Sequence, residues 1–281
     1  RVMQVIRAKH AGACYGVQRA LDMAHEAVAR SGSAHTLGPL IHNPQVVAEL
    51  EREGARVAAA PADIDGGTVI IRSHGVTPEV RAELEERGLD VVDATCPHVA
   101  RAQKAAAELA RQGCRVLVVG EAGHPEVAGL IAYAEEAGGK VDMVASPADV
   151  PAGLYDPIGV VVQTTQMREN LDAVVDVLKA QGLDPIVKNT ICSATSQRQK
   201  TAAELSDEVD AMVVIGGRNS SNTTRLAEIC AEHCPRVFHI ESPAELDAAQ
   251  LASCATVGVT AGASTPEDQI EAVVSALRAL A

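Results

Sequence analysis

The sequence predicts an α/β protein built from three small domains that are related by approximate threefold symmetry. Short β-rich runs are followed by loops of Gly, Ser, His, Asn and Thr and then by helical patterns, and this unit occurs nine times. One unit with a cysteine in its loop precedes two units with polar loops, and this order occurs three times. The cysteines are similarly spaced, because 82 positions separate Cys14 from Cys96 and 96 separate Cys96 from Cys192.

The nine units extend over nearly the whole chain. In order they occupy residues 5–24, 35–50, 68–84, 91–109, 115–130, 160–175, 185–205, 212–229 and 256–273. The repeat predicts domains at 1–95, 96–191 and 192–281, with the strand in residues 1–13 available to pack with the third domain. Each domain has about three strands and three helices, which is small for independent stability. Because ligands bind beyond the carboxyl ends of strands in open α/β sheets, we expect the nine loops to converge if the domains face one axis.

Composition favours a reduced, cytoplasmic protein. The net charge of −13 repels nucleic acid and anionic lipid surfaces, so we expect neither as a partner. No apolar stretch approaches the roughly 20 residues that a membrane span requires, and the N-terminus lacks the layout of a signal peptide. Seven cysteines, an odd count in a long chain, argue against a disulfide framework. Aromatic residues make up 1%, so the core must consist of Ala, Val, Leu and Ile.

Three of the cysteines lie where an apolar run gives way to a helical pattern. Helix N-termini favour the thiolate form that binds metals. If Cys14, Cys96 and Cys192 met on an axis, they would offer three soft ligands and one open position, a set that both zinc and iron–sulfur accept. We interpret the remaining four cysteines as buried apolar residues. They are Cys114, Cys230, Cys234 and Cys254. Of these, Cys230 and Cys234 have C-x3-C spacing on an expected helix.

The polar loops have the composition of an anion site. His42, His74 and His124 follow strands at equivalent places in three units, which favours a shared function over three unrelated capping roles. The hydroxyl-rich turns RNSSN (218–222) and TAGAST (260–265) lead into helices, whose N-terminal N–H groups bind phosphate. A serine there caps the helix in the ordinary case, and capping and phosphate binding can share one turn. No Walker-type loop is present, so a nucleoside triphosphate is not indicated.

Several motifs together resemble one known family. DATCP, GHPEV, QTT, TICSAT, GGRNSSNTTRL and TAGASTP occur in this order over nearly the whole chain. In combination they closely resemble the 4-hydroxy-3-methylbut-2-enyl diphosphate reductases, which catalyse the last step of the methylerythritol phosphate route to isoprenoids. The resemblance implies three pseudo-symmetric α/β domains around a central [4Fe–4S] cluster. Its ligands would be Cys14, Cys96 and Cys192, and its fourth iron would bind the substrate C4 oxygen.

The resemblance also implies roles for the polar residues. Glu126 would donate protons through Thr164, with His124 beside them and Thr195 near the substrate, and ferredoxin or flavodoxin would deliver two electrons. The products would be isopentenyl and dimethylallyl diphosphate. The implied diphosphate pocket comprises His42, His74, His124, Ser220, Ser221, Asn222 and Ser264.

Two alternatives and one departure stay open at the level of sequence. A zinc-dependent hydrolase or lyase would use the same thiolates with Glu126 as base, and a non-catalytic phosphoester-binding protein would use the loops alone. Glu126 also fits a first-turn acid that complements the helix dipole. The family usually has Phe where this chain has Ala13, next to the first ligand, and Tyr15 is the candidate to fill that space.

Overall fold

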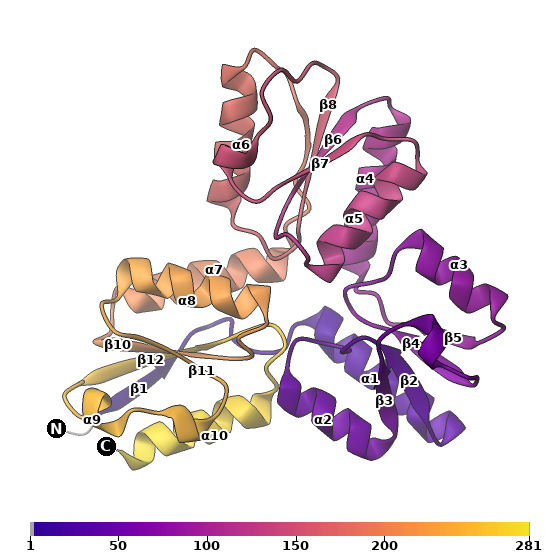
Figure 1. Ribbon diagram of the computed structural model, residues 1–281. Helices are drawn as coiled ribbons and strands as arrows, with labels where there is room; N and C mark the ends of the chain where they lie inside the picture. Colours follow the sequence, from indigo (N-terminus) through magenta and orange to yellow (C-terminus); the bar gives the residue numbers. More distant parts are fainter. Residues whose placement is uncertain (1–2, 281) are drawn as a thin grey trace. The chain divides into compact units, whose positions relative to one another are not determined.

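Twelve parallel strands form three separate sheets in residues 3–280, the part of the chain that the computed structural model describes (Figure 1). The strands are β1 (Gln4–Arg7), β2 (Ala34–Leu37), β3 (Ala55–Ala58), β4 (Thr68–Ile71), β5 (Asp90–Asp93), β6 (Arg115–Val119), β7 (Val141–Val144), β8 (Ile158–Val162), β9 (Ile186–Lys188), β10 (Ala211–Ile215), β11 (Val237–Ile240) and β12 (Thr256–Ala261). Their orders are β3-β2-β4-β5, β7-β6-β8-β9 and β1-β12-β10-β11. Every pairing between neighbours is parallel, which confirms the predicted α/β class.

Helices connect most of the strands, because parallel strands need crossover connections. They are α1 (Tyr15–Ser31), α2 (Pro44–Glu53), α3 (Pro78–Glu86), α4 (Pro97–Arg111), α5 (Pro125–Glu136), α6 (Arg168–Ala180), α7 (Ser193–Ser206), α8 (Ser221–His233), α9 (Ala248–Leu251) and α10 (Glu267–Ala279). Proline at the first or second position begins several of them, including α3, α4 and α5, because its fixed φ suits a first helical turn and its missing N–H is not needed there.

The second sheet shows how an almost purely aliphatic core is organised. Val116 and Val118 pack with α4 and α5 on one face, whereas Leu117 and Val119 pack with α6 on the other. Figure 1 shows these helices on opposite sides of β6 and β8. Because successive side chains of a strand point to opposite faces, a sheet covered on both sides needs a continuous apolar run, and residues 116–119 provide it.

Each sheet has one strand more than the three that the sequence predicts. The additional strands are β3, β7 and β11, which lie at sheet edges and run for four residues each. Their partly exposed side chains give no long apolar run, so periodicity did not find them. A signal does exist, because Pro-Ala-Asp, Pro-Ala-Asp and Pro-Ala-Glu form a 3₁₀ turn after each of these strands, at Pro61–Asp63, Pro147–Asp149 and Pro243–Glu245.

By its contacts the chain divides into two compact units. One contains residues up to Val17, the segment His42–Gln45 and the chain from Ser193 onward, with the third sheet. The other contains Gln18–Ile41 and Val46–Cys192, with the first two sheets. The N-terminal strand β1 pairs with β12, so it belongs to the same sheet as the C-terminal strands. The predicted boundaries after residues 95 and 191 stay a prediction.

Candidate active site

The three cysteines predicted as ligands have the same local structure. Each follows an edge strand, β1, β5 or β9, and each immediately precedes a helix, α1, α4 or α7. The backbone N–H of each donates to a carbonyl oxygen in the loop after the adjacent strand. The three bonds join Cys14 to Ala263 (3.1 Å), Cys96 to Ser73 (2.9 Å) and Cys192 to Thr164 (3.0 Å). One recurring backbone hydrogen bond therefore fixes every cysteine loop to a polar loop of its own sheet.

The donor set fits a thiophilic metal group. Cys14, Cys96 and Cys192 are partly exposed, and none of the seven cysteines, all within residues 3–280, forms a disulfide. The other four are buried, and burial raises the pKa of Cys114 and raises that of Cys230 to about 11. A high pKa disfavours the thiolate, which supports the interpretation of these two as packing residues.

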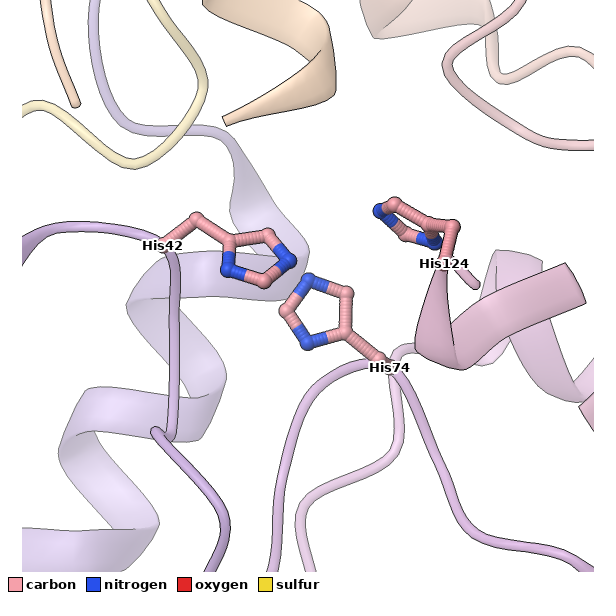
Figure 2. Close-up of side chains that lie close together, drawn as sticks. All are labelled: His42, His74 and His124. Atoms are coloured by element: carbon pink, nitrogen blue, oxygen red, sulfur yellow. The ribbon is translucent and has the colours of Figure 1, made fainter. Parts of the chain in front are cut away.

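His74 and His124 form a ring pair, although they follow strands of two different sheets, β4 and β6. Their ring centroids lie 5.5 Å apart with an angle of 80° between the planes, and Figure 2 shows this edge-to-face arrangement. His124 is the N-cap of α5, where its Nδ1 accepts a hydrogen bond from the backbone N–H of Glu126 (3.2 Å). Burial, with the charge of Arg72 as a smaller cause, lowers the pKa of His124 to about 4. The ring is therefore neutral at pH 7, and its second nitrogen carries the proton.

Glu126 lies in the first turn of α5 with only 1% of its surface exposed. The backbone N–H of Thr164 donates to Oε1 (2.6 Å), and the Thr164 hydroxyl donates to Oε2 (2.8 Å). Burial raises the pKa of Glu126 to about 7, although the two Thr164 hydrogen bonds act in the opposite direction. A buried acid that is half protonated near pH 7 suits proton donation, and a first-turn acid serving only the helix dipole would have no need of this burial.

In the unit that contains the third sheet, hydrogen bonds join two predicted loops, one around His42 and one around Ser264. The Ser264 hydroxyl donates to the backbone oxygen of His42 (3.0 Å). The side-chain nitrogen of Asn43 donates to the backbone oxygen of Ser264 (2.8 Å) and to Oε1 of Gln269 (3.0 Å). Asn43 is only 3% exposed and was missed by sequence reasoning, although it directly follows His42 in the segment LIHNP (residues 40–44).

The last three residues of the RNSSN turn are buried at the start of α8, whereas Arg218 and Asn219 are exposed. Ser220 is the N-cap, and its hydroxyl accepts a hydrogen bond from the backbone N–H of Thr223 (3.3 Å). Ser221 and Asn222 form the first turn and are 8% and 5% exposed. Within residues 3–280, neither the side-chain oxygen nor the side-chain nitrogen of Asn222 has a hydrogen-bond partner. Because buried amides are almost always paired, this side chain is ready to bind a polar ligand.

Thr195 and Tyr15 are the remaining positions that the sequence analysis singled out. Thr195 is buried in the first turn of α7, and within residues 3–280 no hydrogen bond joins its side chain to another predicted site residue. Tyr15 is 71% exposed, so it does not fill a buried space beside Cys14. A guanidinium supports this cysteine loop instead, since Arg198 donates to the backbone oxygen of Gly12 (3.0 Å).

Within the described residues, no helix combines the length and apolar character needed to cross a membrane.

A family model described as LytB protein matches residues 5–278. The chain belongs to the LytB protein family.

Curated relatives of this LytB chain match along almost their whole length. A protein of Pelobacter propionicus is 50% identical over 97% of this chain and 96% of its own. A protein of Geobacter sulfurreducens is 49% identical over 98% of this chain and 97% of its own. Both are named 4-hydroxy-3-methylbut-2-enyl diphosphate reductase, which together with the family model confirms the family resemblance inferred from the motifs.

Two solved structures share the fold. One, described as the reductase that is the terminal enzyme of the non-mevalonate pathway, aligns over 99% of both chains with a TM-score of 0.73 and 42% identity. The reductase from Plasmodium falciparum aligns over 98% of this chain and 88% of its own, with a TM-score of 0.89 and 26% identity. The three-sheet α/β architecture is therefore that of solved family members.

Proposed function

We propose that this LytB chain reduces (E)-4-hydroxy-3-methylbut-2-enyl diphosphate to isopentenyl diphosphate and dimethylallyl diphosphate, the terminal step of non-mevalonate isoprenoid precursor synthesis. Two electrons and two protons enter, the carbon–oxygen bond at C4 breaks, and water leaves. The proposal is supported by relatives of this name at about half identity over nearly the full length. Among the observations of structure, the buried Glu126–Thr164 pair carries it furthest, because a reduction that releases water needs an acid inside the site.

Cys14, Cys96 and Cys192 would hold the cofactor. We propose a [4Fe–4S] cluster, which would supply the electrons one at a time and bind the substrate C4 oxygen at the iron that has no protein ligand. The equivalent backbone hydrogen bonds of the three cysteine loops support this assignment, since they fix the loops without using the sulfur atoms. An external ferredoxin or flavodoxin would deliver the electrons, and a cytoplasmic location stays a prediction.

Glu126 would serve as the proton donor. Its pKa near 7 leaves a substantial protonated fraction at neutral pH, and its two hydrogen bonds to Thr164 hold the carboxyl group in one orientation. The Thr164 hydroxyl, which bonds one carboxyl oxygen, would pass protons onward to the substrate.

The diphosphate would be bound by neutral donors and by a helix N-terminus. His42, His74 and His124 would offer ring N–H groups, while Asn222 and the first turn of α8 would offer amide N–H groups. Ser220, Ser221 and Ser264 would add hydroxyls, and Thr195 would contact the carbon skeleton. Short-range hydrogen bonds of this kind outweigh the screened repulsion from a net charge of −13.

Anaerobic purification tests the proposal and separates the alternatives. We expect brown protein that contains iron and acid-labile sulfide, gives an electron paramagnetic resonance signal on reduction, and converts the allylic diphosphate to both products with a one-electron donor. Colourless protein that contains zinc would favour a hydrolase or lyase instead. Protein that binds the diphosphate equally well after Cys14, Cys96 and Cys192 are replaced by Ser, with no turnover before or after, would favour a binding module.

A further inference from the structure

Arg72 extends from the carboxyl end of β4, in the RSHGV motif that also contains His74. Its guanidinium lies against Gly38, the residue that follows the neighbouring strand β2. A Cβ atom at Gly38 would overlap Nη1 of Arg72 and would lie 3.2 Å from its Cζ. The absence of a side chain at Gly38 therefore leaves room for the guanidinium beyond the carboxyl ends of β2 and β4, which is where open α/β sheets bind ligands.

Among the described residues, the charge of Arg72 has no carboxylate partner. Its Nε is buried without a hydrogen bond, and within residues 3–280 no ion pair involves this side chain. Other arginines of the chain do pair: Arg7 with Glu267, Arg81 with Asp93, Arg115 with Asp142 and Arg218 with Glu245. Burial of Arg72 is strong enough to lower its pKa. A partly buried cation that is left uncompensated is unfavourable in the ligand-free protein, and an anionic ligand would offset this cost.

The Arg72 charge acts on the proposed diphosphate site. It reaches His124 strongly enough to disfavour protonation of that ring, and His124 is in turn the ring partner of His74. With His124 neutral, its ring supplies a hydrogen-bond donor but no positive charge, whereas a diphosphate is multiply charged. Arg72 provides a charge that does not depend on pH, since a guanidinium stays protonated.

We propose that Arg72 is a substrate-binding residue, which supplies the fixed positive charge of the diphosphate subsite beside His74 and His124. The inference rests on the proposed function for the identity of the substrate, but not for the anion itself. A guanidinium offers a planar set of N–H donors that matches phosphate oxygens in pairs, and such charge-assisted bonds are stronger than those of neutral donors.

The test uses the anaerobically purified holoprotein and the variants Arg72→Gln and Arg72→Lys. We measure kcat and KM for the allylic diphosphate and, by calorimetry, the affinity for inorganic diphosphate. Arg72→Gln is expected to raise KM and weaken inorganic diphosphate binding by about 10- to 100-fold while kcat stays within about threefold, because the contact is made equally in ground and transition states. Arg56→Gln, at an exposed position of β3, is the matched control and leaves all values unchanged.

Each outcome decides the matter. Unchanged KM and diphosphate affinity in a folded Arg72→Gln protein would overturn the inference and leave the proposed function intact. Wild-type protein that binds inorganic diphosphate more tightly than Arg72→Gln does, but never turns over the allylic diphosphate, would contradict the proposed function and support the inference. If Arg72→Gln does not fold, Arg72→Lys decides, since it keeps the charge but loses the paired donors. In that variant, an increase in KM of about fivefold or more supports the inference, because the paired guanidinium donors are lost. Unchanged KM together with unchanged affinity for inorganic diphosphate would show that no paired guanidinium–phosphate bonds exist, and would overturn it.

Discussion

Thr164 holds the carboxyl group of Glu126 with both of its donors, although the two residues are 38 positions apart in the chain. Its backbone carbonyl also accepts the hydrogen bond from the N–H of Cys192. One residue of the loop after β8 therefore fixes both the buried acid and a cysteine that we propose as a cluster ligand. Displacing this loop would disturb proton donation and cofactor binding together.

Replacing Glu126 by Gln is expected to lower kcat by about 100-fold or more, because an amide of the same size cannot donate the proton. The KM and the iron content should stay close to wild type, since within residues 3–280 the carboxyl group of Glu126 accepts its hydrogen bonds from Thr164 and from no proposed cluster ligand. Steady-state turnover and iron analysis of the anaerobic protein measure these quantities.

The matched control for this substitution is Glu135→Gln. Glu135 lies on the same helix, α5, but is exposed near its C-terminal end, so all three quantities should be unchanged. A Glu126→Gln protein that keeps kcat within about threefold of wild type would contradict the assignment of Glu126 as the acid.

Glu126 should also make stability depend on pH. Its pKa is about 7 in the folded protein and 4.5 for an unperturbed glutamate, so the folded state binds the proton more tightly than the unfolded state. The penalty for burying the charged form is absent below pH 4.5, grows between pH 4.5 and 7, and is complete above pH 7. Its full size is on the order of 3 kcal/mol.

Thermal unfolding of wild type and Glu126→Gln at several pH values measures this penalty. Relative to wild type, the variant should gain roughly 5 °C in Tm as the pH rises from 4.5 to 8. The comparison between the two proteins removes contributions that both share, including that of a bound cofactor. A Tm difference that does not change with pH would show that Glu126 is not titrating in this range.

The sequence predicts the repeated scaffold well because it is local. Nine strand–loop–helix units are visible as apolar runs followed by helical periodicity, and the shared position of Cys14, Cys96 and Cys192 marks their threefold order. The edge strands β3, β7 and β11 escape this approach, since four partly exposed residues carry no clear period. The repeated Pro-Ala-Asp or Pro-Ala-Glu turns after them are the signal that would have located them.

The details of the site depend on contacts that are remote in sequence. Nothing local to Glu126 indicates that it is buried or that Thr164 bonds it, so its sequence context alone fits an exposed first-turn acid equally well. Arg72 was likewise visible in RSHGV, but the absence of a counter-ion is a property of the folded chain. Loop motifs identify the residue types of a site, whereas burial and pairing decide what each residue can do.

Cys96→Ser is expected to lose most of the bound iron and all turnover. The backbone hydrogen bond from residue 96 to Ser73 does not involve the sulfur, so the loop should keep its conformation. Cys254→Ser, the same change at a buried cysteine outside the proposed ligand set, should keep its iron and its rate. Iron and sulfide content with paramagnetic resonance spectra provide the comparison, and a Cys96→Ser protein with normal iron content would contradict the proposed ligand set.

Ser220 and Asn222 should respond in opposite ways to replacement by Ala. Ser220 caps α8, so its loss should lower the free energy of unfolding by about 1 kcal/mol. The buried Asn222 side chain has no hydrogen-bond partner in the described part of the chain, so Asn222→Ala breaks no hydrogen bond there and introduces a better helix former. We therefore expect Asn222→Ala to leave Tm unchanged or raise it.

Both substitutions should nevertheless raise KM, by about 10-fold for each lost hydrogen bond to the diphosphate, because a bond to a charged group contributes more than a neutral one. The informative variant is Asn222→Ala, in which a KM effect without a stability loss separates ligand binding from a structural role. Measurements of Tm and KM on the same protein sample decide the matter. If Asn222→Ala lowered Tm and left KM unchanged, the Asn222 amide would have a structural role and would not belong to the diphosphate pocket.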